Sequence, residues 1–329
     1  MTGQREAPVL AIDIGGTKIM TAIIPADGRV LAKDVWPTGA GEGVASVIDR
    51  LCRSAEKLVK SNNLKFRQLA GIGIACAGAI DTGRGMVTIS PNLPGWVDIP
   101  LAQMVRERLK VDTFLVNDAS AAALGEHRYG AGKGVDNLVL LTLGTGIGGG
   151  IIADGKLYLG ASGAAGEIGH MTIDVNGPEC PCGNTGCLEV LASGTAIVRE
   201  AMRRLINGEK SSLTEMVGGK TEGITAETVE KAARKGDGLA LDVLARAAGY
   251  LGVGLANVVN IFNPEMIILG GGMAGMGDLL IDPARRLVAE RAFPVSAGAV
   301  KITTARLGNE AGVYGAAAFM REAGARRAR

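Results

Sequence analysis

Short apolar runs alternate along the chain with longer stretches in which apolar residues recur every three or four positions. The short runs are rich in Val, Ile and Leu and are bounded by glycine, which is typical of buried strands, whereas the longer stretches have the period of helices. This alternation predicts an α/β fold. The expected strands cover residues 9–14, 19–24, 30–35, 69–74, 113–116, 138–143, 151–152 and 266–269, and the expected helices cover residues 44–61, 101–109, 119–125 and 311–323, with 196–250 mostly helical.

Two parts of the chain carry a similar pattern. The segments 23–31 (IIPADGRVL) and 151–159 (IIADGKLYL) each follow a glycine-rich loop, and each of those loops follows an apolar strand. With 329 residues, of which 47% are hydrophobic, the chain is long enough for two domains with separate cores. The repeat therefore predicts two similar halves.

Three glycine-rich loops follow apolar strands. The first, 13–18 (DIGGTK), and the second, 143–150 (LGTGIGGG), let the backbone approach a phosphate, and Asp13 is suited to ligate Mg²⁺. The second loop matches the dinucleotide pattern G-x-G-x-x-G, but that site needs a helix after the loop, and here a strand and turn are predicted. The third, 269–273 (LGGGM), suits an adenine lying on the backbone. We expect these loops to bind a nucleoside triphosphate, with plain tight turns as the alternative.

Asn117 and Asp118 lie between a predicted strand and a predicted helix. Open α/β sheets place their ligands at such positions. Asp118 is therefore predicted to accept the proton of an attacking hydroxyl that Asn117 orients. A role for Asp118 as a helix N-cap is the alternative.

A cysteine-rich segment offers four potential metal ligands, His170, Cys180, Cys182 and Cys187. A Cys₃His set fills all positions of a tetrahedral zinc site, and closed sites of this kind are structural. A disulfide between Cys180 and Cys182 would close a strained ring. A nucleophilic cysteine would need a nearby base, and the other histidine, His127, is expected on a helix surface. We expect zinc here, and buried apolar roles for Cys52 and Cys76.

These motifs, in this order, resemble those of the ROK family of sugar kinases, repressors and uncharacterised relatives. The resemblance covers nearly the whole chain, and the CxCGxxGCxE signature at 180–189 is its most specific part. It implies an actin-like, two-lobed fold of the hexokinase and Hsp70 superfamily, with ATP and sugar in a cleft between the lobes. The expected boundaries are a small lobe at 1–118, a large lobe at 119–307 with a zinc segment at 170–187, and a C-terminal helix at about 308–329 that returns to the small lobe.

The resemblance also assigns roles to residues that match the family's motifs. Asp118 resembles the catalytic base, and Gly271 the adenosine motif. The phosphate and Mg²⁺ positions correspond to Asp13, Gly15, Gly16, Thr17, Lys18, Thr145 and Gly146. The positions that contact sugar hydroxyls correspond to Gly78, Asn92, Asn117, Glu167, His170 and Glu189. One departure is Ala77, which stands where relatives usually carry proline, so we expect a looser loop before Gly78.

The charge and the hydropathy of the chain argue against nucleic acid and membranes as partners. Lys and Arg number 35 against 33 Asp and Glu, so neither nucleic acid nor an anionic membrane is an expected partner. The apolar stretch 138–152 is interrupted by five glycines, and 249–262 is too short and carries Asn257 and Asn260, so neither is expected to span a membrane. Nothing before residue 9 resembles a signal peptide, and we expect a cytoplasmic protein.

The expected function is ATP-dependent phosphorylation of a hexose, with glucose as the substrate, Mg²⁺ and ATP as cofactors and zinc as a structural ion. A kinase for N-acetylmannosamine, mannose or fructose is the alternative within the family. A sugar-responsive regulator is the alternative from another class, but family repressors carry an N-terminal helix-turn-helix, and only 12 residues precede Asp13. By resemblance, a homodimer or homotetramer is expected.

Overall fold

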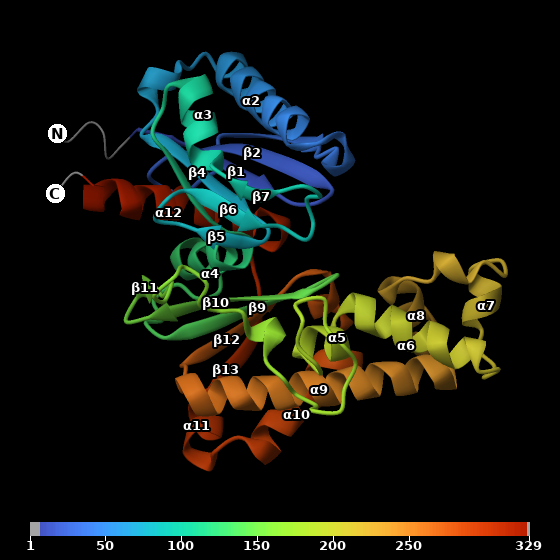
Figure 1. Ribbon diagram of the computed structural model, residues 1–329. Coiled ribbons are helices and arrows are strands. Elements are labelled where there is room, and N and C mark those ends of the chain that lie inside the picture. Colours follow the sequence, from blue (N-terminus) through green and yellow to red (C-terminus); the bar gives the residue numbers. More distant parts are fainter. Residues whose placement is uncertain (1–6, 328–329) are drawn as a thin grey trace. The chain divides into compact units, whose positions relative to one another are not determined.

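The structure, a computed structural model, describes residues 7–327 (Figure 1). The first six residues of the predicted small lobe and the last two of its returning helix lie outside the described residues. Contacts within the chain divide it into two units. Unit 1 contains the residues up to Asp136, Gly150–Gly166 and the residues from Arg306 onward, and unit 2 contains Asn137–Gly149 and Glu167–Ala305.

The main sheet of unit 1 has the strand order β3-β2-β1-β4-β8. Its central strand β1 pairs antiparallel with β2 and parallel with β4, and β4 pairs parallel with β8. The strands are β1 (Val9–Ile14), β2 (Lys18–Ile24), β3 (Ala32–Pro37), β4 (Gly71–Cys76) and β8 (Thr113–Asn117). A smaller antiparallel sheet contains β5 (Ala79–Asp81), β6 (Met86–Ile89) and β7 (Val97–Ile99).

Helices cover both faces of the main sheet of unit 1 (Figure 1). Side chains of a strand alternate between its faces, and Leu10 and Ile12 of β1 belong to a core cluster with Leu51 of α2 (Val44–Ser61) and side chains of α3 (Leu101–Leu109). On the other face, a Cβ on Gly73 would lie 2.0 Å from the carbonyl oxygen of Ala316, so α12 (Ala311–Arg327) packs directly on the backbone of β4. The helices are η1 (Ala40–Glu42), α2 (Val44–Ser61), η2 (Phe66–Gln68), α3 (Leu101–Leu109), α4 (Asp118–Tyr129), η6 (Gly308–Glu310) and α12 (Ala311–Arg327).

A second five-stranded sheet has the order β11-β10-β9-β12-β13, which repeats the plan of the first. In each sheet, the strand that precedes the glycine turn is the central strand, and it pairs in parallel with a strand that comes later in the chain. The strands are β9 (Leu138–Leu143), β10 (Ile147–Ala153), β11 (Lys156–Leu157), β12 (Met266–Gly270) and β13 (Lys301–Thr304). The internal repeat in the sequence thus corresponds to two sheets of the same order.

The predicted start of β10 at residue 151 is wrong. The strand begins at Ile147, so the turn before it is only 144–146 and the following glycines lie within the strand. A Cβ on Gly150 would lie 2.7 Å from the carbonyl oxygen of Ala119 and 2.6 Å from the Cβ of Ala123. Glycine is needed in the strand there because α4 packs against its backbone.

The remaining part of unit 2 is mostly helical, as predicted. Its helices are η3 (Ile168–His170), α5 (Leu188–Ala192), α6 (Gly194–Ile206), α7 (Leu213–Met216), η4 (Thr221–Gly223), α8 (Ala226–Arg234), α9 (Gly238–Phe262), η5 (Gly272–Met276), α10 (Gly277–Arg291) and α11 (Pro294–Ala299). The apolar segment ending at Phe262 belongs to a longer helix than predicted, because α9 has 25 residues and is long and apolar enough to cross a membrane by length and composition alone. It is nevertheless a core helix, since 61% of its most apolar window is buried and it contacts α5, α6, α8 and α10.

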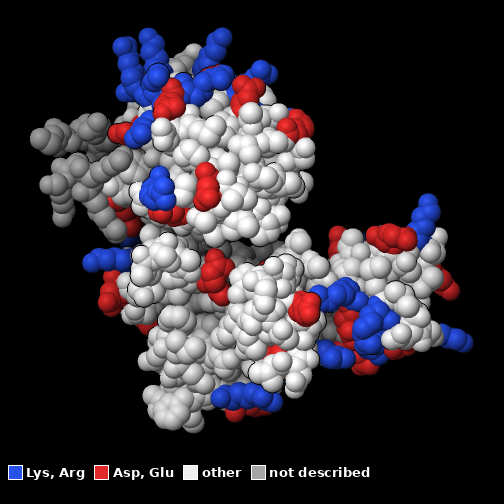
Figure 2. Space-filling model, viewed as in Figure 1, with Lys and Arg blue, Asp and Glu red and all other residues white. Residues whose placement is uncertain are grey.

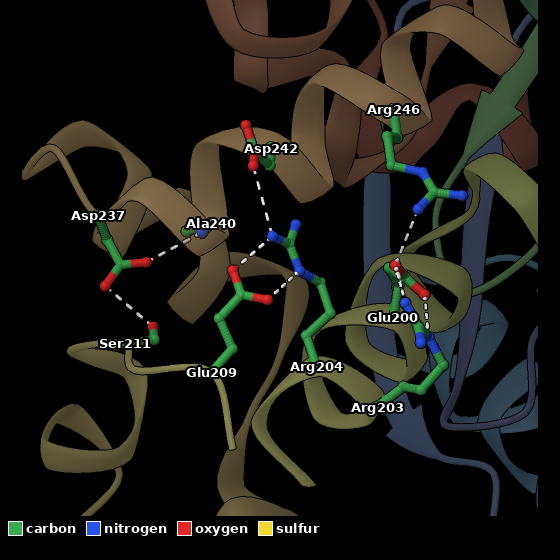
Figure 3. Close-up of polar contacts among 9 residues, drawn as sticks. All are labelled: Glu200, Arg203, Arg204, Glu209, Ser211, Asp237, Ala240, Asp242 and Arg246. Atoms are coloured by element: carbon green, nitrogen blue, oxygen red, sulfur yellow. Dashed lines mark hydrogen bonds and ion pairs between the residues drawn. The ribbon is translucent and has the colours of Figure 1, made fainter. Parts of the chain in front are cut away.

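Ion pairs join α6 to α9 at the surface (Figure 3). Arg204 of α6 pairs with Glu209 and, at 3.4 Å, with Asp242 of α9, and Arg246 of α9 lies 3.3 Å from Glu200 of α6. Exposed pairs contribute at most about 1 kcal/mol each, so the buried face of α9 dominates its stability. In Figure 2 this helical part of unit 2 carries acidic and basic side chains next to one another.

Candidate active site and metal centre

The first candidate phosphate site is the turn between β1 and β2. The N–H of Gly15 donates to the carbonyl of Lys18 at 3.0 Å and closes the turn. Thr38, which follows β3 and is fully buried, donates from Oγ1 to the carbonyl of Gly15 at 2.7 Å and from its N–H to that of Thr17 at 2.9 Å. Arg50 of α2 donates to the carbonyl of Thr38. Thr38 thus holds the turn, although no motif in the sequence marks it.

The two acids of unit 1 are close enough for their charges to interact. Burial, and then the negative charge of Asp118, raise the pKa of Asp13 to about 7, although Lys18 acts in the opposite direction. Burial also raises the pKa of Asp118, against hydrogen bonds to its Oδ1 from the Ala119 N–H (2.9 Å) and the Asn117 amide (3.0 Å). A carboxylate with a raised pKa is a better proton acceptor near neutral pH, as a general base requires.

Asn117 is the residue that connects Asp118 to Gly78. Its Oδ1 accepts from the Ser120 N–H at 3.0 Å, so Asn117 is the N-cap of α4. Its Nδ2 donates to the carbonyl of Gly78 and to Oδ1 of Asp118, both at 3.0 Å. The alternative role of Asp118 as the N-cap is therefore wrong, and Asp118 is instead the first residue of the helix.

The backbone around Gly78 is closely packed. Gly78 has φ of +117°, and a Cβ there would lie 2.4 Å from the carbonyl oxygen of Ile89, so the position requires glycine. The N–H of Ala77 donates to the carbonyl of Ile14 at 3.3 Å. Proline, the usual family residue at this position, has no N–H and could not form this hydrogen bond. Ala77 therefore adds a hydrogen bond between this loop and β1.

Asn92 lies in a loop anchored by two buried apolar side chains. Leu93 is 0% and Trp96 1% exposed, while Asn92 itself is exposed. A Cβ on Gly16 would lie 3.0 Å from the carbonyl oxygen of Asn92, so the predicted sugar loop contacts the predicted phosphate turn. The two anchoring residues were not predicted, because they become buried only through packing distant in sequence.

In unit 2, the candidate phosphate turn lies between β9 and β10. Oε2 of Glu189 accepts from the Ile147 N–H at 2.8 Å, and a Cβ on Gly146 would lie 2.3 Å from the same oxygen. Oγ1 of Thr195, in α6, donates to the carbonyl of Thr145 at 2.8 Å. One oxygen of Glu189, predicted only as a sugar contact, therefore also holds this turn.

Gly271 lies beside the end of β9. It follows β12 with φ of +82°, and a Cβ there would lie 2.3 Å from the carbonyl oxygen of Leu143. Only glycine fits this close approach. The predicted adenosine position and the turn that starts after Leu143 are thereby neighbours in unit 2.

The four predicted zinc ligands converge. Their ligand atoms all lie within 4.8 Å of one another in the set His170, Cys180, Cys182 and Cys187. The Sγ of Cys180 is 3.7 Å from Nδ1 of His170, and the Sγ atoms of Cys182 and Cys187 are 3.8 Å apart. Ligands of a tetrahedral zinc, with Zn–S of about 2.3 Å and Zn–N of about 2.0–2.1 Å, lie about 3.5–3.8 Å apart. The residues therefore fit a zinc ion with four protein ligands.

The thiols of this cluster have unequal acidities. Burial raises the pKa of Cys180 and raises that of Cys187 to about 12, while the N–H of Asn184 lowers that of Cys182. A bound cation removes the protons from such thiols, because the thiolate is the metal ligand. The disulfide alternative for Cys180 and Cys182 is wrong, since all cysteines of the chain are free thiols.

His170 lies between the cluster and a predicted sugar contact. Its Nδ1 faces the cysteines, and its Nε2 is 3.9 Å from Oε2 of Glu167, which is exposed. A histidine whose second nitrogen faces a carboxylate is typical of zinc sites, because the carboxylate orients the ring.

The expectation that His127 lies on a helix surface is wrong. It is 6% exposed, because residues 119–127 of α4 are all buried. Burial lowers its pKa, and its Nδ1 has no hydrogen-bond partner within the described residues. Cys52 and Cys76 are buried, as predicted.

Comparison with known proteins identifies the family of this chain. The ROK family description matches residues 9–323. A glucokinase of Thermotoga maritima is 37% identical over 314 residues, which cover 95% of this chain and 97% of that protein. The crystal structure of a ROK family glucokinase from Streptomyces griseus in complex with glucose and AMPPNP is 34% identical, with a TM-score of 0.82 over 96% of this chain and 99% of that chain.

A regulator is also similar. The crystal structure of a ROK family transcriptional regulator, a homologue of the E. coli MLC protein, is 30% identical, with a TM-score of 0.84 over 96% of this chain and 78% of that chain. These matches confirm the predicted actin-like fold. The chain belongs to the ROK family.

Proposed function

We propose that the protein phosphorylates glucose with ATP, as a glucokinase. The observation that carries the proposal is the placement of Asp118, a buried acid with a raised pKa that a neighbouring amide and an N–H hold at the start of α4. Full-length relatives named glucokinase, 36–39% identical to this chain, support the same activity.

Asp118 acts as the general base. It accepts the proton of the attacking sugar hydroxyl, while Asn117 keeps the carboxylate in place through the bond to Oδ1. Phosphoryl transfer depends mostly on positioning and on neutralising charge, so a base needs only correct placement and basicity. The raised pKa of Asp118 supplies the basicity.

The glycine turns hold the triphosphate. In unit 1 the binding groups are Asp13, Gly15, Gly16, Thr17 and Lys18, and in unit 2 they are Thr145, Gly146 and Gly271. Asp13 is the acid that would hold Mg²⁺, which neutralises charge on the phosphates when bound. Lys18 adds a positive charge next to Asp13.

The zinc cluster has a structural role. Its four ligands leave no position open for a substrate. By holding His170 and Cys187 it fixes Glu167, His170 and Glu189, which we assign to sugar hydroxyls. Gly78, Asn92 and Asn117 are the corresponding sugar contacts of unit 1.

An ADP-release assay over a panel of hexoses tests the substrate. With Mg-ATP we expect the highest kcat/KM on glucose, followed by mannose, fructose and N-acetylmannosamine. A clear preference for one of the latter three would move the assignment to that sugar. Sugar binding without any ADP release would favour a regulator, the function of the MLC homologue that this chain resembles.

A further inference from the structure

Unit 1 contains a cavity that none of the site residues assigned above lines. Its volume is about 770 Å³, within the usual range for small-molecule sites. Its walls come from the turn after β5, from α3, β8 and α12, and from the loop 157–163. The lining combines the buried or half-buried apolar residues Leu115 and Leu157 with the exposed residues Arg84 and Arg106.

The charges that line this cavity leave two cations available. The carboxylate of Glu322 is paired with Arg128 at 2.6 Å, and Oδ1 of Asp81 accepts from the backbone N–H of Arg84 at 2.9 Å. In contrast, the guanidinium groups of Arg84 and Arg106 have no hydrogen bond or ion pair within the described part of the chain. Free guanidinium groups bind phosphate and carboxylate oxygens in a two-pronged geometry.

A hydroxyl in the lining also lacks a partner. The Oγ1 of Thr82 is buried and makes no hydrogen bond to any described residue. A buried polar atom without a partner is unfavourable, and a ligand oxygen would satisfy it. Ser162, in the loop 157–163 that also lines the cavity, is exposed and supplies a second hydroxyl. The cavity thus offers two cations that can bind an anionic group of a ligand and two hydroxyls that can hydrogen-bond to its other polar groups.

Two segments that line the cavity are close in sequence to proposed sugar contacts. The strand β5 starts immediately after Gly78, and the loop 157–163 ends four residues before Glu167. The loop also rests on this strand, because a Cβ on Gly163 would lie 2.9 Å from the carbonyl oxygen of Ile80. A ligand in the cavity therefore touches both segments at once.

We propose that this cavity is an effector site for a sugar phosphate. Its phosphate binds Arg84 and Arg106, its hydroxyls bind Thr82 and Ser162, and its binding changes the affinity of the protein for the sugar substrate. The effector role rests on the proposed kinase function, whereas the binding site does not.

Calorimetric titration with ribose 5-phosphate and glucose 6-phosphate tests the site, with glucose and AMPPNP present to occupy the substrate sites. We expect one binding event per chain that weakens at least about tenfold in the Arg84→Ala/Arg106→Ala double variant. Arg67→Ala, which removes an exposed arginine of η2 outside the cavity, is the matched control and should bind as the wild type does. Uncharged ribose should not compete. Because both cavity arginines are exposed, activity without effector should be unchanged.

Kinetics test the effector role. Ribose 5-phosphate should change the KM for the sugar at least about threefold in the wild type and not in the double variant. No binding of either sugar phosphate, or equal binding by the double variant, would overturn the site. Binding without any change in KM would overturn the effector role. The calorimetric measurement needs no turnover, so an inactive protein would refute the kinase function without affecting this result.

Discussion

Hydrogen bonds from single residues determine how the acids and turns of unit 1 are held. Asn117 uses its amide to connect Asp118 with Gly78 and to cap α4, and Thr38 holds the carbonyls of the phosphate turn. Each of the two residues bonds a glycine, Gly78 or Gly15, that has no side chain of its own to pack. The buried acids have raised pKa values, so the folded state is less stable near neutral pH than it would be with amides in their place.

Asp13→Asn should therefore stabilise the protein at pH 8 in the absence of Mg²⁺ and nucleotide. The pKa of Asp13 is about 7 in the folded protein, against 3.8 for an ordinary aspartate side chain. Because the pKa of Asp13 is raised on folding, its ionisation destabilises the folded state. This loss of stability is complete above about pH 7 and disappears as the pH falls towards 3.8. We expect a gain on the order of 1–3 kcal/mol at pH 8 and a smaller gain at pH 5, measured as thermal unfolding.

An acid with the opposite shift serves as the control for this measurement. Hydrogen bonds from the Trp36 indole and Lys57 lower the pKa of Asp34. Asp34→Asn should therefore destabilise the protein at pH 8, and by less as the pH falls below 3.8. An equal effect of Asp13→Asn at pH 5 and pH 8 would contradict the raised pKa of Asp13.

Thr38→Val should weaken ATP binding. The substitution keeps the shape of the side chain and removes the hydroxyl that donates to the Gly15 carbonyl. A lost hydrogen bond of this kind costs about 0.5–1.5 kcal/mol, so the KM for ATP should rise about two- to tenfold. Thr38→Ser retains the donor and should restore the KM. A lower melting temperature with unchanged KM would show that Thr38 contributes only to stability.

The elements with an unambiguous apolar period were predictable from the sequence. The strands Val9–Ile14 and Leu138–Leu143 and the helices Val44–Ser61 and Leu101–Leu109 have the predicted bounds. The start of β10 was not predictable, because glycine is a poor strand former and its use there depends on α4 packing against the strand. Local sequence is thus sufficient where a continuous apolar run or a helical apolar period marks the element, and it fails where two elements meet backbone to backbone.

The start of α9 depends on one acidic residue. Oδ1 of Asp237 accepts from the Ala240 N–H at 2.9 Å as the N-cap, and Oδ2 accepts from the hydroxyl of Ser211 at 2.9 Å (Figure 3). The same Oδ2 also accepts from the hydroxyl of Ser212 at 2.8 Å. Burial favours a higher pKa, but these hydrogen bonds lower the pKa of Asp237 overall. The carboxylate thus connects α9 to the segment before α7.

Asp237→Ala should destabilise the protein by about 1–3 kcal/mol at pH 7. Asp237→Asn should cost less, because the amide oxygen still caps the helix. The lowered pKa means that the contribution of Asp237 is present above 3.8 and is lost as the pH falls below it. Denaturant unfolding of both variants measures these differences, and equal stability of Asp237→Ala and the wild type would exclude this role.

Sequence motifs predicted most of the candidate site, but not how it is supported. The zinc ligands and the glycine turns were found because their chemistry requires fixed residue types at short spacing. Thr38 and Trp96 support the site through contacts between distant segments, which no local motif records. The lobe boundaries at 118 and 307 and the individual ligand contacts stay predictions.

Removal of zinc should affect sugar binding before it affects the main sheets. A strong chelator should release one zinc per chain, lower the melting temperature and raise the KM for glucose more than that for ATP, because the cluster lies next to Glu167 and Glu189. Cys187→Ser should have the same effects. A protein that contains no zinc and is fully active in chelator would contradict the metal site.

The central claim is that Asp118 is the base of an ATP-dependent glucose kinase. The most direct measurement is the rate of glucose 6-phosphate formation by the wild type and by Asp118→Asn, with glucose binding to both proteins measured by calorimetry. We expect turnover by the wild type, and in the variant a loss of about 10²–10⁴-fold with glucose binding retained. A variant that works at nearly the wild-type rate, or a wild type that forms no glucose 6-phosphate, would contradict it.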